Sequence, residues 1–166
     1  MKTATRMLRL TPAIVAATLL LTACAPVLNL EPAEDAENTA CADVIVGLRD
    51  LDVIGDLSAR ETNAQGTAAW GEPAGIILRC GVPTPPPTSE SPCATVDDVD
   101  WLRDDTDDPN FVFTTYGRTP AIEVIIDSDG DPDNPDDGVS GVEALTELAA
   151  AVALVPATSQ CTTPTG

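Results

Sequence analysis

Apolar residues recur along the chain at spacings that predict two helices. One apolar stripe predicts a helix from Thr39 to about Asp50. The residues of this stripe are Cys41, Val44, Ile45, Leu48 and Leu51. Further on, Ser140 with Glu143 three residues later matches a capping box, and the apolar spacing continues until Pro156 ends the helix.

A period of two, in which every second residue shares one face, predicts about four strands. From Gly75 the period is two: positions 76, 78, 80 and 82 share one face, and 77 and 79 the other. A second strand is predicted at 96–102, and segments 111–116 and 121–126 predict an antiparallel hairpin. Residues 55–70 carry no clear period, and 82–93 form a proline-rich loop. The pattern predicts an α+β two-layer sandwich, a small and mainly antiparallel sheet of about four strands with two helices on one face.

The first residues have the pattern of an export signal. Lys2, Arg6 and Arg9 precede an apolar run over 10–23 that is too short to span a membrane. The run ends in Leu-Thr-Ala-Cys24, which resembles the lipobox of bacterial lipoproteins; the alternative is an ordinary secretory signal with an incidental cysteine. The prediction is a signal peptide at 1–23, a lipidated Cys24 with a flexible acidic tether at 24–39, and one domain at 40–166. The expected location is the extracytoplasmic face of the cell membrane.

The charge of the chain excludes some classes of binding partner. The chain has 27 acidic and eight basic residues among 166, and a formal net charge of −19. Three of the basic residues lie in the predicted signal peptide, so the remainder carries 27 acids against five arginines, a formal −22. Such a surface argues against nucleic acid and repels anionic lipid head groups, so acyl chains on Cys24 would have to hold the protein at the membrane.

Four cysteines remain in the predicted domain, an even number that indicates two disulfides in an exported chain. Three pairings of Cys41, Cys80, Cys93 and Cys161 are open. We favour Cys80–Cys93, which would enclose the proline-rich loop, and Cys41–Cys161, which would tie the ends of the domain. A zinc site is the weaker alternative, because no Cys-x2-Cys spacing exists.

Two aspartate-rich runs, 97–108 and 127–137, are candidates for calcium binding. The second run has Asp at every other position, at Asp127, Asp129, Asp131 and Asp133, which resembles calcium loops of the dockerin and thrombospondin type. The EF-hand pattern fails in detail, because Pro132 stands where the loop needs glycine. A solvated acidic loop is the simpler interpretation, and no other cofactor is expected.

Other candidate residues have structural interpretations beside functional ones. Arg79 and Glu123 share the same parity in two strands and could form an ion pair across the sheet. Arg118 lies in a predicted turn, where it would be freer to bind a ligand. The few aromatic residues could form a sugar-stacking groove, but core packing is the better interpretation. These residues are Trp70, Trp101, Phe111, Phe113 and Tyr116.

Catalytic motifs are missing from the sequence. The chain has no histidine, which removes His-dependent triads and His-ligated metals, and it shows neither a nucleophile elbow nor a phosphate-binding loop. The leading hypothesis is therefore a non-enzymatic binding module that interacts with an envelope protein or cell-wall component. The alternatives are a calcium- or small-ligand-binding module and, less favoured, a carboxylate-based cell-wall hydrolase.

Four segments in order carry a resemblance to a known family. They are Trp70-Gly-Glu-Pro73, Ile77-Leu-Arg-Cys-Gly-Val82, Val99-Asp-Trp-Leu102 and the run 115–124, which reads Thr-Tyr-Gly-Arg-Thr-Pro-Ala-Ile-Glu-Val. Over residues 40–161 the chain resembles the actinobacterial lipoproteins of domain-of-unknown-function family 3515. The resemblance implies a membrane-anchored, secreted protein of a Gram-positive actinobacterium, and it implies no catalytic residues.

Overall fold

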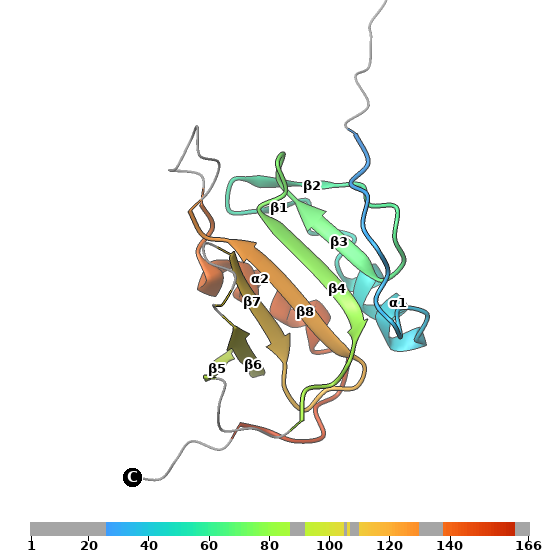
Figure 1. Cartoon of the computed structure of the whole chain (residues 1–166), viewed down its shortest axis with the longest axis vertical. Helices are drawn as coiled ribbons and strands as arrows, with labels where there is room; N and C mark the ends of the chain where they lie inside the picture. Colours follow the sequence, from blue (N-terminus) through green and yellow to red (C-terminus); the bar gives the residue numbers. More distant parts are fainter. Residues whose placement is uncertain (1–25, 87–91, 105, 107–109, 130–137, 162–166) are drawn as a thin grey trace, which may run out of the picture.

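The computed structural model describes residues 26–86, 92–104, 106, 110–129 and 138–161. Within these residues the chain forms one eight-stranded antiparallel sheet and two helices (Figure 1). The predicted sheet of about four strands is therefore wrong, because the sheet has twice that number. No helix in the described part of the chain is long and apolar enough to span a bilayer.

The sheet consists of two four-stranded meanders that meet at their last strands. The strand order is β1-β2-β3-β4-β8-β7-β6-β5, so β4 and β8 pair at the centre. The first meander comprises β1 (Val53–Ile54), β2 (Leu57–Arg60), β3 (Thr67–Trp70) and β4 (Ile76–Val82). The second comprises β5 (Cys93–Val96), β6 (Val99–Asp104), β7 (Asn110–Thr115) and β8 (Ala121–Asp127).

The sequence pattern missed β2 and β3 in the ambiguous segment 55–70 and β1 just before it, and it misplaced one strand boundary. Strand β1 has only two residues, and β2 and β3 have four residues each with alanine or serine among them, so none of the three shows an apolar period. Pairing with neighbouring strands holds them in the sheet. The segment predicted as one strand at 96–102 is a hairpin instead. Asp97 and Asp98 adopt φ of 45° and 62°, which two-residue hairpin turns of the primed type require.

Both helices lie on the same face of the sheet, behind it in Figure 1. Helix α1 (Thr39–Gly47) begins after Asn38, whose side chain accepts a hydrogen bond from the amide of Ala40 at 3.0 Å. Helix α2 (Gly141–Val152) begins after Ser140 as predicted, but Ser140 makes no side-chain capping bond. The core between helices and sheet contains the residues that alternation assigned to one face, such as Ile76, Leu78 and Cys80.

The disulfides differ from the pairing that the sequence favoured. Cys41 bonds to Cys80, and Cys93 bonds to Cys161, so both favoured pairs are wrong. The first bond joins α1 to the central strand β4, and the second joins edge strand β5 to the segment after α2. Pairing depends on which elements become neighbours, and the missed strands place β4 beside α1 and far from β5.

The segment expected to be a flexible tether lies on the domain. Residues 26–38, which we call the N-terminal strap, run beside the first meander before α1 (Figure 1). Leu28 forms a parallel bridge with Thr62, and the amide of Asp35 donates to the carbonyl of Gly81 at 2.9 Å. Ala33 and Ala36 are buried against Val82 and Ala121, residues of β4 and β8. Backbone pairing of this kind carries no hydrophobic period, which explains why the sequence pattern missed it.

Candidate functional site

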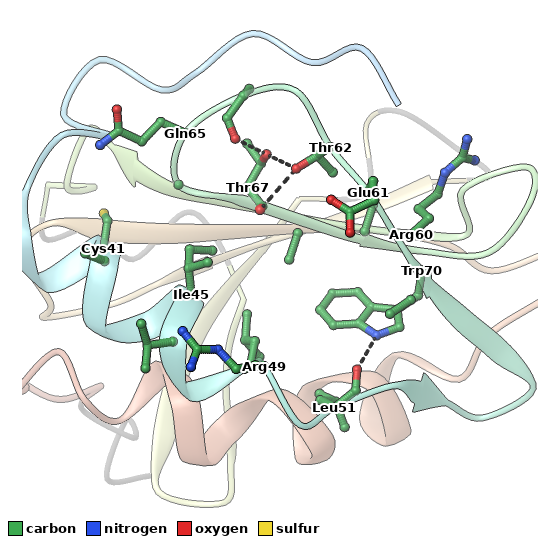
Figure 2. A pocket seen from close by; sticks show the side chains of 18 of the residues that line it. Cys41, Ile45, Arg49, Leu51, Arg60, Glu61, Thr62, Gln65, Thr67 and Trp70 are labelled. Atoms are coloured by element: carbon green, nitrogen blue, oxygen red, sulfur yellow. Dashed lines mark hydrogen bonds between the residues drawn. The ribbon is translucent and has the colours of Figure 1, made fainter. Parts of the chain in front are cut away.

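A pocket of about 610 Å³ lies between α1 and the β2–β3 hairpin (Figure 2). Its volume is within the range of small-ligand sites, roughly 300–1,000 Å³. One wall comes from α1 and the residues that follow it, up to Asp52. The opposite wall comes from the end of β2, the loop after it and β3. The pocket therefore combines a helix that the sequence predicted with two strands that it did not.

The helix wall is held in place by a cap and a disulfide. The Asn38 cap starts α1, and the Cys41–Cys80 bond fixes its first turn to β4. Ile45 is half-buried and Arg49 is exposed, and both line the pocket from this side. Figure 2 shows their side chains on the helix side of the space beneath β3.

Hydroxyl groups shape the opposite wall. Thr67 Oγ1 donates to the carbonyl of Ala64 at 2.6 Å, and the same oxygen lies 2.8 Å from Thr62 Oγ1. Gly66 has a φ of +69°, a left-handed conformation that lets the loop turn back into β3. These bonds hold the loop between β2 and β3 in one conformation, and that loop forms part of this wall of the pocket.

Trp70 closes one end of the pocket. Its indole Nε1 donates to the carbonyl of Leu51 at 3.0 Å, and the residue is only 1% exposed (Figure 2). The bond ties the end of β3 to the segment that leaves α1. Ile45 and Leu51, both half-buried, supply accessible apolar surface between these walls.

Two arginines line the pocket, and they differ in their partners. Arg60 Nη1 donates to the carbonyl of Gly71 at 3.0 Å, and Nη2 contacts the carbonyl of Pro26 at 3.0 Å and Glu72 Oε2 at 2.7 Å. Arg49 makes no ion pair within the described residues, although the chain holds 27 acids. An exposed guanidinium beside apolar side chains can bind a carboxylate whose apolar part lies on Ile45 and Leu51.

The predicted lipidation and calcium residues are only partly described. Cys24 lies outside the described residues, as do Asp131 and Asp133. Asp127 ends β8, and Asp129 follows it at the surface. Within the described part of the chain, no three Cys, Asp or Glu side chains are grouped as metal ligands. Calcium binding stays a prediction.

The structure brings Arg79 and Glu123 together. They face each other in the β4–β8 register, and Arg79 Nη1 lies 3.0 Å from Glu123 Oε1. The ion pair lies on the sheet face opposite the helices, because its neighbours Leu78 and Val124 are fully buried in the core. Its position at the joint between the meanders gives it a structural role.

Arg118 is not the free turn arginine that the sequence suggested. It is 5% exposed, and its guanidinium donates to the carbonyl of Val155 and, at 3.5 Å, to that of Asp98. Burial lowers the pKa of this guanidinium, and the charge of Asp100 opposes that effect. Arg118 therefore joins the β7–β8 turn to the β5–β6 turn and to the chain after α2.

The aromatic residues belong mainly to the core. Trp70 and Trp101 are 1% and 0% exposed, and Phe113 is buried with them, so the predicted core packing is confirmed for these three. Phe111 packs partly on the core, and the guanidinium of Arg103 lies 4.2 Å from the centre of its ring. Tyr116 is half-buried, so none of the five aromatic residues, all of which the structure describes, is fully exposed.

Sequence reasoning missed the pocket residues Ile45, Arg49, Leu51 and Thr62 as a group. The one signal available was Arg49, an arginine at the end of a predicted helix in a very acidic chain. An arginine at this position does not indicate a pocket until the structure places β2 and β3 beside α1.

Comparison with known proteins gives a family and no function. The family described as "Protein of unknown function (DUF3515)" matches residues 8–159. No curated protein and no solved structure matches the chain.

Proposed function

The chain belongs to the DUF3515 family of proteins of unknown function, and from that premise we propose that it is an envelope lipoprotein with a non-enzymatic binding domain. In this proposal Cys24 carries the lipid anchor and the domain lies on the extracytoplasmic side of the membrane. The pocket between α1 and β3 binds a short peptide segment of an envelope partner. The basic start, apolar run and lipobox-like end of residues 1–24 support the anchor.

The single observation that carries the binding role is the composition of the pocket. Half-buried Ile45 and Leu51 offer apolar surface beside Arg49, which has no ion pair within the described residues. A peptide group with a carboxylate next to an apolar side chain matches both features at once. The chain also lacks histidine, the commonest general base, so binding explains the pocket better than catalysis does.

The test uses a matched pair of small probes. We expect millimolar N-acetyl-leucine to shift the backbone amide signals of Ile45, Arg49 and Thr62 in an NMR titration of the domain. N-acetyl-leucinamide, which lacks the carboxylate, should shift them more weakly. Because the contact with Arg49 is exposed, Arg49→Ala should weaken N-acetyl-leucine binding about two- to five-fold, the effect of roughly 0.4–1 kcal/mol.

Arg103→Ala is the control, because Arg103 is exposed and contacts Phe111 outside the pocket. It should leave the titration unchanged. Equal affinity for the acid and the amide, or shifts scattered away from the pocket, would contradict the proposed ligand chemistry.

A further inference from the structure

The N-terminal strap, residues 26–38, is attached to the domain along its length. At its start, Pro26 accepts a hydrogen bond from Arg60, and the amide of Leu28 donates to the carbonyl of Glu61 at 2.9 Å. The Asn63 side chain then accepts from the amide of Leu30 at 2.7 Å. These three contacts place the first described residues at the end of the domain where β2 meets the β3–β4 turn (Figure 1).

A glycine allows the other end of the strap to pack closely. Gly81 has a φ of +98°, and a Cβ there would lie 2.4 Å from the backbone nitrogen of Ala36. Ala36 itself is 3% exposed. The strap therefore packs directly on the backbone of β4, and little slack exists between Pro26 and α1.

The short distance to Cys24 sets how far the domain can stand from its anchor. Only Ala25 separates Cys24 from Pro26. Two residues of fully extended chain span at most about 7 Å. We propose that the end of the domain formed by Pro26, Val27, Arg60 and Glu72 lies directly against the lipid bilayer, with the sheet standing away from it. The inference rests on the proposed lipid anchor at Cys24, and it replaces a mobile stalk by a fixed orientation.

The side chains at this end of the domain suit contact with a lipid surface when a covalent anchor holds the domain there. Val27 is 51% exposed and lies beside the anchor, so it offers apolar contact at the interface. Glu61 and Glu72 are exposed acids, so anionic head groups supply no attraction there and the anchor has to hold the contact. Because Arg60 and Glu61 also line the pocket, one wall of the pocket belongs to the membrane-facing end.

The test measures height above the bilayer by energy transfer. Full-length lipidated protein is placed in phosphatidylcholine vesicles that contain an acceptor-labelled lipid. A donor dye is attached through an unnatural amino acid at Ser58 in one sample and at Pro83 in another. Both residues are exposed, and they lie near opposite ends of β4, which spans about 23 Å. Transfer should be clearly more efficient from Ser58 than from Pro83.

A linker variant is the matched control. Ten Gly/Ser residues inserted between Ala25 and Pro26 add a flexible span of roughly 17 Å, so transfer from Ser58 should fall toward the value for Pro83. Equal transfer from both positions, in protein whose intact mass shows the lipid, would overturn the fixed orientation and leave the anchor standing. An intact mass without lipid on Cys24 would overturn the anchor, and the orientation with it.

Discussion

At the scale of single residues, Arg118 shows how a charge can serve structure in a chain that is short of cations. Its guanidinium donates to backbone carbonyls from two separate segments, at Asp98 and Val155. Arg118→Ala leaves both carbonyls without that donor and opens a cavity at a site 5% exposed. We expect a loss of about 2–4 kcal/mol in the free energy of unfolding, measured by urea denaturation. Arg103→Ala, at an exposed position, should cost less than about 1 kcal/mol, and equal losses for the two variants would contradict the structural role of Arg118.

Gly81 gives a second prediction at this scale. Gly81→Ala requires both a left-handed φ of +98° and space that the backbone of Ala36 already fills. The strap should therefore detach, and cleavage by a glutamate-specific protease at Glu31 and Glu34 should speed up at least about tenfold. Gly141→Ala is the control, because its Cβ would meet only the ring of Phe113, at 3.4 Å. Unchanged cleavage of the Gly81 variant would show that the strap is held without this close approach.

At the scale of elements, the Cys41–Cys80 bond holds the helix wall of the pocket. Replacing both cysteines by serine should lower the free energy of unfolding by about 3–4 kcal/mol, because the bond spans 39 residues. The same variant should lose the N-acetyl-leucine response, since α1 is then free to shift. The Cys93→Ser/Cys161→Ser variant should keep that response, because this bond lies outside the pocket lining. Peptide mapping that found Cys80 bonded to Cys93 would contradict the assignment.

The same elements show how much the sequence could predict. Helix α2 and the β7–β8 hairpin carry strong periods, and both form where the pattern placed them. Strand β3 reads Thr-Ala-Ala-Trp and has no period; it forms because β2 and β4 flank it. The candidate pocket exists because β3 and α1 lie next to each other in space. The sequence therefore could not group the pocket residues. The Arg79–Glu123 ion pair could be predicted, because it required only that the two residues have matching positions in two strands.

At the scale of the whole molecule, charge is the dominant feature. After residue 23 the chain has 27 acids and five arginines, so like charges repel across a small domain. Within the described residues, the ion pairs Arg60–Glu72 and Arg79–Glu123 offset a small part of this repulsion. Salt should therefore stabilise the fold by screening. We expect the melting temperature to rise by several degrees between 20 and 500 mM sodium chloride, in a thermal melt of residues 25–166 under oxidising conditions.

A comparison of calcium with magnesium distinguishes screening of the acidic charges from binding of a specific ion. At matched ionic strength, calcium and magnesium should raise the melting temperature equally if the aspartate-rich run after β8 contributes only charge. A saturable rise with calcium alone would instead indicate a site, because a selective ligand stabilises the state that binds it. An Asp127→Asn/Asp129→Asn variant decides the matter. It should lose the calcium-specific rise if these side chains bind the ion, and it should respond to calcium and magnesium as the unaltered chain does if they do not.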